Sequence, residues 1–315
     1  MDETLMIHLG ILLGAGVVLA GAAGIIISAA VSLSKRFGLT SFTVGFLVLG
    51  LATSTTELFV AIGAVIDGIP QLSVGNLLGG SLLLLSLVMG ISSVVAGRIT
   101  LDRGLSFREI VLSSAVIVSP AFVLWDGTAT RLDGIFLISM YLLHGFLLKQ
   151  DQERIHGLTK KTFRMRGLSY DVVMLTAGLG VLAISAKAIV GSAEHLIASL
   201  NIPTFVFGLI LLSLGTNLPE LALALQAALQ RKKGLAFADF LGSSAANTLI
   251  LGGLALYAPF TIEAQHKLTI SLALLLGATA YFLWAVSSGK TITRKEGFGL
   301  LFFYAAFLLY EMFGP

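Results

Sequence analysis

The chain contains no cysteine among its 315 residues. This absence excludes disulfide bonds, thiolate metal sites, covalently attached c-type haem and thiol nucleophiles. Any metal ion bound by the chain must therefore use oxygen or histidine ligands.

Charged residues are also scarce, at 12% of the chain against roughly a quarter in soluble domains. The composition is 56% hydrophobic and the mean hydropathy is +0.95, which excludes an ordinary soluble protein. At about 20 apolar residues per membrane crossing, this length has room for on the order of ten spans and no sizeable soluble domain. We read the net charge of +3 as a record of topology and not of nucleic-acid binding.

Runs poor in charge predict an all-α polytopic membrane protein with ten transmembrane helices. The fourth, fifth and tenth runs are short, and Pro120 is expected to interrupt the fourth. Residues 1–6 carry acidic groups but no Lys or Arg, so we expect the first run to be a retained helix and not a signal peptide. The predicted spans are 7–31, 41–66, 72–97, 109–125, 133–148, 170–197, 204–230, 235–257, 268–288 and 297–312.

The basic residues alternate with the predicted spans. Seventeen of the twenty lie in the connections after odd-numbered spans, two lie after even-numbered spans, and Lys187 lies within the sixth span. Because cytoplasmic loops hold the excess of Lys and Arg, we expect both termini on the non-cytoplasmic side. The basic stretch 149–169 is then a cytoplasmic linker between five spans in 1–148 and five in 170–315. Its basic face could alternatively bind anionic lipid.

The two halves are related in sequence. At an offset of 163, residues 42–90 align without a gap to residues 205–253, with 14 identities in 49 positions. An odd number of spans per half makes the second half enter the membrane in the opposite sense. We therefore predict two inverted-topology repeats of five helices, an arrangement typical of secondary transporters with a binding site at the midplane.

Each repeat places one glutamate within an apolar span. Glu57 and Glu220 align, and each follows a threonine by four residues, Thr53 and Thr216 respectively. This spacing puts the hydroxyl and the carboxylate on one helix face. A charge inside the membrane is costly, so such residues usually serve function.

The neighbouring residues add further oxygen atoms. Ser54 and Asn217 occupy matching positions beside the two threonines. Pro219 cannot donate to the carbonyl of Gly215, which frees that carbonyl within the span. The matching residue, Thr56, is not proline, so a comparable distortion there is plausible but not required.

Carboxylate, hydroxyl, amide and carbonyl oxygens suit a hard cation such as Ca²⁺ or Na⁺. Two carboxylates match the charge of a divalent ion. Two alternatives stay open: that protonated Glu57 and Glu220 join helices by hydrogen bonds, and that they carry protons.

The next span of each repeat is rich in small residues. We read the glycines, including Gly80 and Gly242, mainly as sites of close helix packing. Ser243 and Asn247 share a helix face and could complete an oxygen cage, whereas their partners Gly80 and Leu84 offer no side-chain ligand.

Asn76 and Asp239 align near the start of these spans. They could line an access path, or they could simply lie at the membrane interface. The five histidines show no ligand spacing, and we expect them to be peripheral.

The motifs GTNLPEL (215–221) and ATSTTEL (52–58), each followed by a Gly/Ser-rich span, resemble the cation/calcium antiporter superfamily, with the sodium/calcium exchanger family most similar. The resemblance implies ten spans, outside termini and two alpha repeats at about 42–90 and 205–253. It also implies Glu57 and Glu220 as the central cation ligands, assisted by Thr53, Ser54, Thr216, Asn217 and Ser243, and by carbonyl groups near Gly50 and Ser213.

Three positions depart from the exchanger pattern. That pattern usually has an acidic residue where Asn247 stands, Asn where Leu84 stands and Ser where Gly80 stands. We expect these departures to reduce the number of ion sites, so that proton coupling rivals sodium coupling.

We therefore predict an antiporter that exchanges Ca²⁺ or a similar cation for Na⁺ or H⁺ in the cell membrane, without a cofactor, nucleic acid or obligatory protein partner. A passive cation channel using the same glutamates is the main alternative. A non-transporting scaffold is another. The sequence has no HExxH motif, phosphate-binding loop or nucleophile with a base at useful spacing, so we do not expect an enzyme.

Overall fold

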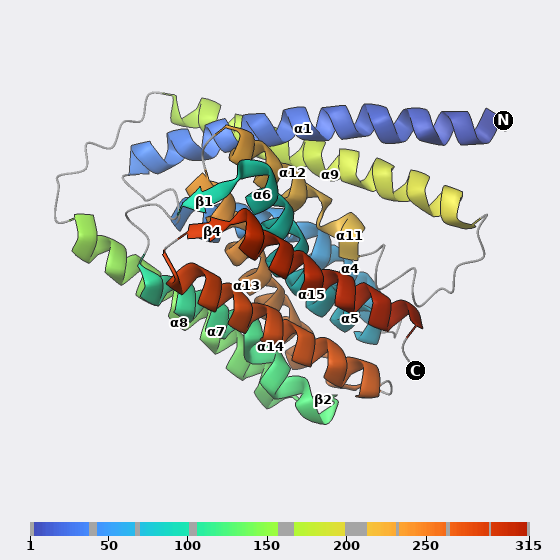
Figure 1. Cartoon of the computed structure of the whole chain (residues 1–315), viewed down its shortest axis with the longest axis vertical. Coiled ribbons are helices and arrows are strands. Elements are labelled where there is room, and N and C mark those ends of the chain that lie inside the picture. Colours follow the sequence, from blue (N-terminus) through green and yellow to red (C-terminus); the bar gives the residue numbers. More distant parts are fainter. Residues whose placement is uncertain are drawn as a thin grey trace.

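The computed structural model describes residues 3–37, 43–66, 70–100, 106–156, 167–198, 213–230, 233–262, 265–289 and 291–313. These segments are almost entirely helical (Figure 1). In the first half the helices are α1 (Glu3–Phe37), η1 (Val44–Leu49), α3 (Gly50–Thr53), α4 (Thr55–Ile66), α5 (Pro70–Leu83), η2 (Leu84–Val88), α6 (Met89–Ala96), α7 (Phe107–Val123), η3 (Leu124–Asp126) and α8 (Arg131–His156).

The helices of the second half are α9 (Leu168–Ala198), α11 (Ser213–Thr216), α12 (Leu218–Leu229), α13 (Lys233–Tyr257), α14 (Gln265–Ser287) and α15 (Arg294–Phe313). Each predicted span falls on one or more of these helices, although the seventh, 204–230, begins outside the described residues. Helix α8 continues to His156, into the stretch expected to be the linker, and residues 157–166 lie outside the description.

Six helical segments within the described ranges are long and apolar enough to cross a membrane. The bent combination of η1 and α3 with α4 makes a seventh candidate. The fourth and fifth predicted spans, which are short in sequence, are among the six.

Two short antiparallel ribbons join loops that are distant in sequence. Strand β1 (Arg98–Thr100) pairs with β4 (Thr291–Thr293), with Ile99 opposite Ile292. Strand β2 (Thr128–Ala129) pairs with β3 (Phe260–Thr261), with Thr128 opposite Thr261. Each ribbon therefore joins a loop of the first half to a loop of the second.

Helix α13 lies at the centre of the bundle (Figure 1), where it packs against α8, η1, α12, α7, α3 and α5. Helices α1 and α9 lie side by side at one edge and pack along each other. Helix α1 begins and α15 ends toward the same end of the bundle (Figure 1).

The expected interruption at Pro120 is wrong, because α7 continues through this residue to Val123. Proline removes the N–H that would bond the carbonyl of Val116. That carbonyl instead accepts from the hydroxyl of Ser119 at 2.7 Å and from Thr248 of α13 at 3.0 Å. The hydroxyl of Thr248, in the second half of the chain, thus replaces part of the hydrogen bonding that proline removes.

Candidate functional site

Two helix breaks occur at matching positions of the two halves. Helix α3 ends at Ser54 (φ −69°, ψ 7°), and α12 begins after Asn217 (φ −96°, ψ 9°). Across the first break, the segments 44–53 and 55–66 bend by 40°. Since Ser54 and Asn217 are aligned by the offset of 163, the breaks are features of the repeat.

The two breaks have different local causes. Pro219 lies in the first turn of α12 and has no N–H to donate to Gly215. The first break lacks a proline. There, the hydroxyl of Thr55 donates to the carbonyl of Ala52 at 2.7 Å and that of Thr56 donates to Thr53 at 3.0 Å. Such hydroxyl bonds to the backbone bend helices, and the distortion that the sequence allowed at this position is confirmed.

Each break is followed by a buried glutamate. The side chains of Glu57 and Glu220 are 1% and 0% exposed, and the two groups interact electrostatically. No carboxylate oxygen of either residue has a hydrogen-bond partner among the described residues. Two unpaired buried carboxylates are costly, because burial removes the water that would solvate their charge.

Each threonine lies beside the glutamate of the other half of the chain. The hydroxyl of Thr53 lies beside the Glu220 carboxylate, and that of Thr216 lies beside Glu57. Both hydroxyls are oriented away from the carboxylates: Thr53 bonds to the carbonyl of Leu49 at 3.0 Å, and Thr216 bonds to Oδ1 of Asn76 at 3.2 Å. Each hydroxyl oxygen therefore keeps a lone pair for another ligand.

The amide side chains of Asn217 and Asn247 also donate to the protein and keep their oxygens free of hydrogen bonds. Asn217 donates through Nδ2 to the carbonyl of Ser213 at 2.8 Å. Asn247 donates through Nδ2 to the carbonyl of Leu77 and to the hydroxyl of Ser81, both at 3.3 Å. The Oδ1 atoms of both amides, like Oγ of Ser54, are buried without a hydrogen-bond partner in the described structure. The site therefore contains several buried oxygen atoms that can accept a hydrogen bond or bind a cation.

The backbone carbonyls of Gly50 and Ser213, which were predicted to assist cation binding, have hydrogen-bond partners, unlike the side-chain oxygens above. The carbonyl of Gly50 accepts from the backbone N–H of Ser54 at 3.2 Å, and that of Ser213 accepts from the N–H of Asn217 at 3.2 Å. Both carbonyls are therefore engaged in protein hydrogen bonds.

Ser243 of α13 joins this set. Its Oγ lies 3.1 Å from Oγ1 of Thr53. The contact depends on a close crossing, because a Cβ placed on Gly50 would lie 2.5 Å from the carbonyl carbon of Gly242. The packing role expected for Gly242 is confirmed.

Gly80 and Leu84 have distinct surroundings. A Cβ on Gly80 would lie 2.9 Å from Nδ2 of Asn217 and 3.3 Å from Nδ2 of Asn247, so the two amides occupy the space beside this glycine. Leu84 begins the π-helical turn η2 and is fully buried. Gly80 and Leu84 therefore offer no side-chain oxygen, whereas the aligned residues Ser243 and Asn247 of the second half do.

Asn76 and Asp239 are both buried beside the site. Asn76 accepts the bond from Thr216, and Asp239 interacts electrostatically with Glu220. The sequence signal was their alignment at the same offset as the glutamates, but their depth could not be read from it.

One histidine differs from its expected position. His144 is buried, its Nε2 lies 2.9 Å from Oγ of Ser113, and its ring packs edge-on to Phe46 at 5.0 Å between centroids. It is therefore not peripheral. In the described ranges no three His, Asp or Glu side chains converge as a metal cluster.

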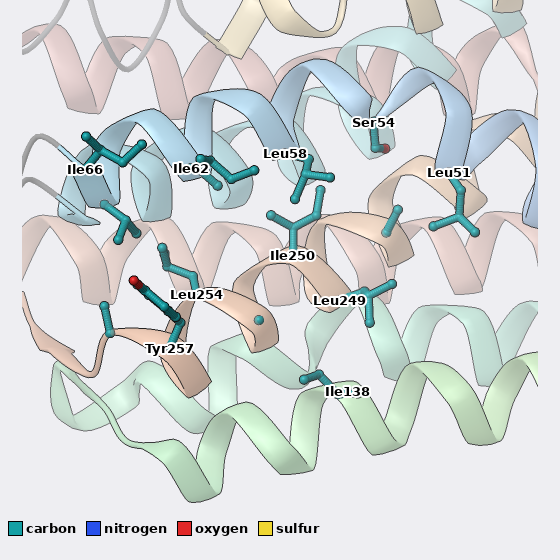
Figure 2. Close-up of a pocket in the computed structure, with 15 residues that line it drawn as sticks. Leu51, Ser54, Leu58, Ile62, Ile66, Ile138, Leu249, Ile250, Leu254 and Tyr257 are labelled. Carbon is teal, nitrogen blue, oxygen red and sulfur yellow. The ribbon is translucent and has the colours of Figure 1, made fainter. Parts of the chain in front are cut away.

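A cavity of about 930 Å³ lies between α4, α13 and α8 (Figure 2). Figure 2 shows Leu51, Ser54, Leu58, Ile62 and Ile66 along one side, facing Ile250, Leu254 and Tyr257 of α13. Ser54, at the helix break, lines this cavity but is only 2% exposed, whereas Ile66 and Tyr257 at the other end are strongly exposed.

Comparison with known proteins agrees with this arrangement. The chain is 29% identical over 248 residues to the inner membrane protein YrbG of Escherichia coli, covering 76% of each chain. It is 26% identical over 323 residues to the sodium/calcium exchanger MaX1 of Methanosarcina acetivorans, covering 90% of this chain and 92% of that one.

The fold matches a solved structure of the sodium-calcium exchanger NCX_Mj with a TM-score of 0.83 and 21% identity, covering 97% of this chain and 98% of that one. The family described as sodium/calcium exchanger protein matches residues 7–148 and 170–313. The chain is therefore an integral membrane protein that belongs to the sodium/calcium exchanger family.

Proposed function

We propose that this protein is a secondary active antiporter that exchanges Ca²⁺, or a similar cation, for Na⁺ or H⁺ by alternating access. The transported cation binds at the membrane midplane between Glu57 and Glu220. The observation that carries this proposal is the pair of buried, unpartnered carboxylates placed by matching helix breaks in the two halves. Such a pair can be neutralised by a divalent ion.

The oxygen set supports a cation as the substrate. Thr53 and Thr216 donate their protons elsewhere, and Asn217 directs its N–H bonds to the protein. The oxygens of these groups then remain for coordination, together with Ser54, Ser243 and Asn247. Hydroxyl, amide and carboxylate oxygens are ligands that hard cations prefer, and they require no resident cofactor.

We further propose ten spans in two inverted repeats, with both termini on the non-cytoplasmic side. Three contacts each join two segments that this topology places on the same side of the membrane. Strand β1 pairs with β4 and Arg36 pairs with Asp171, all on the expected cytoplasmic side. Strand β2 pairs with β3 on the expected outer side.

In this topology the cavity of Figure 2 opens outward, because Ile66 and Tyr257 end the second and eighth spans. The cavity leads toward Ser54, so an ion from outside would meet the site at the first helix break. Alternating access then requires a group of helices to move and open the opposite side. The α1–α9 pair at the edge of the bundle is the group that we propose to move (Figure 1).

Competition for the two carboxylates supplies the coupling. An empty site leaves two buried negative charges that resist closure in a low dielectric, whereas a site loaded with Ca²⁺ or with the counter-ion is neutral and can be occluded. Exchange follows if only loaded sites change access.

Reconstituted vesicles test this proposal. We expect ⁴⁵Ca²⁺ uptake into proteoliposomes to require an outward Na⁺ gradient or an outward H⁺ gradient, imposed in separate experiments. Calcium flux that runs down its own gradient without any counter-ion would instead identify a channel. No calcium movement under either gradient would reject Ca²⁺ as the substrate.

A further inference from the structure

The cavity between α4, α13 and α8 is lined by apolar side chains (Figure 2). Of its fifteen lining residues, only Ser54 and Tyr257 carry a polar side-chain atom, and these two lie at opposite ends. The volume of about 930 Å³ falls within the range of about 300–1,000 Å³ that is usual for ligand pockets. The cation site described above uses none of the apolar part of this cavity.

The offset of 163 gives the cavity a counterpart elsewhere in the bundle. The offset extends to the last helix of each half, because α8 and α15 begin at the matching residues Arg131 and Arg294. In the same register, Ile138 of α8 matches Leu301 of α15. Helix α8 packs on α13, and α15 packs on α6. The α8–α13 crossing that borders the cavity therefore corresponds to the α15–α6 crossing.

The counterpart is filled by a side chain of the protein. A Cβ on Gly90 of α6 would lie 2.8 Å from Cδ2 of Leu301, so this leucine covers the glycine. The residue of α13 that matches Gly90 is Gly253. A Cβ on Gly253 would meet no atom of the described residues within 4 Å, and Gly253 lines the cavity. The space that Leu301 fills at one crossing is therefore open at the other.

A shift of one residue accounts for this difference. The π-helical turn η2 precedes Gly90 and adds one residue to its turn, because its hydrogen bonds close over five residues and not four. Helix α13 is a continuous α-helix. Its covered glycine is consequently Gly252, where a Cβ would lie 2.9 Å from Cγ1 of Ile138. Gly253 is left facing the cavity, so the opening follows from the helix geometry of the two halves.

The surroundings of the cavity favour a hydrocarbon occupant. A bound water needs two to four polar partners, which the side chains between Ser54 and Tyr257 do not offer. An empty cavity would forfeit the dispersion contacts of its lining. Leu58 and Ile62 on its α4 side are 43% and 47% exposed, and both lie within a predicted membrane span. The molecules that surround this part of the chain are therefore lipid acyl chains.

We infer that the cavity binds one acyl chain of a phospholipid from the outer leaflet. The chain lies along α13 over Gly253, as Leu301 lies over Gly90. Its polar end lies beside Tyr257, because tyrosine suits the membrane interface. Its methyl end points toward Ser54. Lipid tails are as apolar as leucine, so packing against the cavity wall and not transfer out of water stabilises the bound chain.

This site goes beyond the proposed function, but its effect on ion access rests on it. A bound chain excludes water from the cavity and from the approach to Ser54 on this side. A hydrated cation cannot enter hydrocarbon without a large desolvation cost. Entry of an ion by this route therefore requires the chain to withdraw.

Photocrosslinking of the purified full chain in phosphatidylcholine nanodiscs tests the inference. The probe is a phosphatidylcholine with a diazirine near the end of one acyl chain. We expect adducts at Ile250, which lines the cavity, and at Phe302 of α15, which is 69% exposed and reports contact with bulk lipid. Gly253→Leu should lower the ratio of Ile250 to Phe302 adducts by at least about tenfold, since even one methylene in an apolar pocket can change binding on that scale.

The matched control is Gly63→Leu. A Cβ on Gly63 of α4 also meets no described atom within 4 Å, but this glycine does not line the cavity. Its variant should keep the adduct ratio of the unmodified protein. Leucine favours helix formation over glycine at both positions, and size-exclusion profiles should verify that each variant is folded.

A second measurement uses the absence of native cysteine. In the same nanodiscs, a water-soluble maleimide should modify Ile250→Cys far more slowly than Thr261→Cys, whose position lies in ribbon strand β3 and is exposed. Equally fast modification of both would show that water fills the cavity and would overturn the inference.

The crosslinking has two outcomes that would also overturn the site: no adducts at Ile250 in the unmodified protein, or an unchanged ratio in folded Gly253→Leu. The effect on access has its own test, because a leucine at position 253 cannot withdraw. Uptake of ⁴⁵Ca²⁺ should be slower for Gly253→Leu than for Gly63→Leu, and equal uptake would overturn the role in access. Failure of the proposed function looks different, since the adducts would persist while the unmodified protein moved no calcium under any gradient.

Discussion

Thr53 and Ser243 place their hydroxyl oxygens 3.1 Å apart, which joins the broken helix of the first half to the central helix α13 of the second. Gly50 and Gly242 approach closely where the two helices cross. Thr53 and Ser243 each follow one of these glycines within one helical turn, so their contact lies next to the crossing. The geometry of the site therefore depends on how closely these two backbones approach.

The crossing predicts a strong effect of adding one methyl group. Gly50→Ala should destabilise the protein by about 1–3 kcal/mol, as overpacking of a filled contact does, because its Cβ would lie 2.5 Å from the carbonyl carbon of Gly242. Thermal unfolding in detergent measures the change. Gly63→Ala is the control, since a Cβ there meets nothing within 4 Å. An equal melting temperature for the two variants would contradict the close crossing.

A second prediction concerns the proline in α7. Thr248→Val should cost about 1 kcal/mol of stability, because it removes a hydrogen bond to a buried carbonyl that Pro120 leaves without its helical donor. Introducing Pro120→Ala restores that donor, so the same threonine substitution should then cost less.

The control for this cycle is Thr279→Val. Thr279 donates to the carbonyl of Leu275 at 2.8 Å within the regular helix α14. Thr279→Val should cost less stability than Thr248→Val, and its cost should be the same with proline or alanine at position 120. Additive effects of Thr248→Val and Pro120→Ala would show that the two residues are not coupled.

A third prediction tests topology and uses the absence of native cysteine. In intact cells, a membrane-impermeant maleimide should label Thr261→Cys, which lies in the ribbon on the proposed outer side. It should label Thr291→Cys, in the other ribbon, only after permeabilisation. The opposite pattern, or labelling of both in intact cells, would reject the proposed orientation.

A fourth prediction concerns Gly80, where the exchanger pattern has serine. Gly80→Ser should reduce transport and not improve it, because the new Cβ would lie 2.9 Å from Nδ2 of Asn217 and displace that amide. Gly180→Ser is the control, since a Cβ there meets nothing within 4 Å. Faster ⁴⁵Ca²⁺ uptake by Gly80→Ser than by the unmodified protein would contradict this account of the position.

The sequence was sufficient for the features that depend on local pattern. Hydropathy placed the helices, and the offset of 163 aligned Ser54 with Asn217, where the structure has its two breaks. The tight packing expected at Gly242 is likewise a local consequence of a missing side chain.

Other features depend on how distant segments meet, which spacing along one helix does not specify. The spacing of Thr53 and Glu57 predicted one shared helix face, but the break at Ser54 separates them into α3 and α4. The hydroxyl of Thr53 lies beside Glu220 instead. Pro120 looked disruptive because the hydroxyl that satisfies the freed carbonyl of Val116 belongs to Thr248, 132 residues later in the chain. Burial of His144 and Asp239 similarly required the arrangement of neighbouring helices.

The central claim is that Glu57 and Glu220 share the transported cation. It is tested most directly by ⁴⁵Ca²⁺ uptake into proteoliposomes under the effective counter-ion gradient, comparing Glu57→Gln, Glu220→Gln and the buried control Glu311→Gln. The account predicts that either central substitution abolishes uptake, whereas Glu311→Gln retains it. Uptake at the unmodified rate by folded Glu57→Gln or Glu220→Gln would contradict the account.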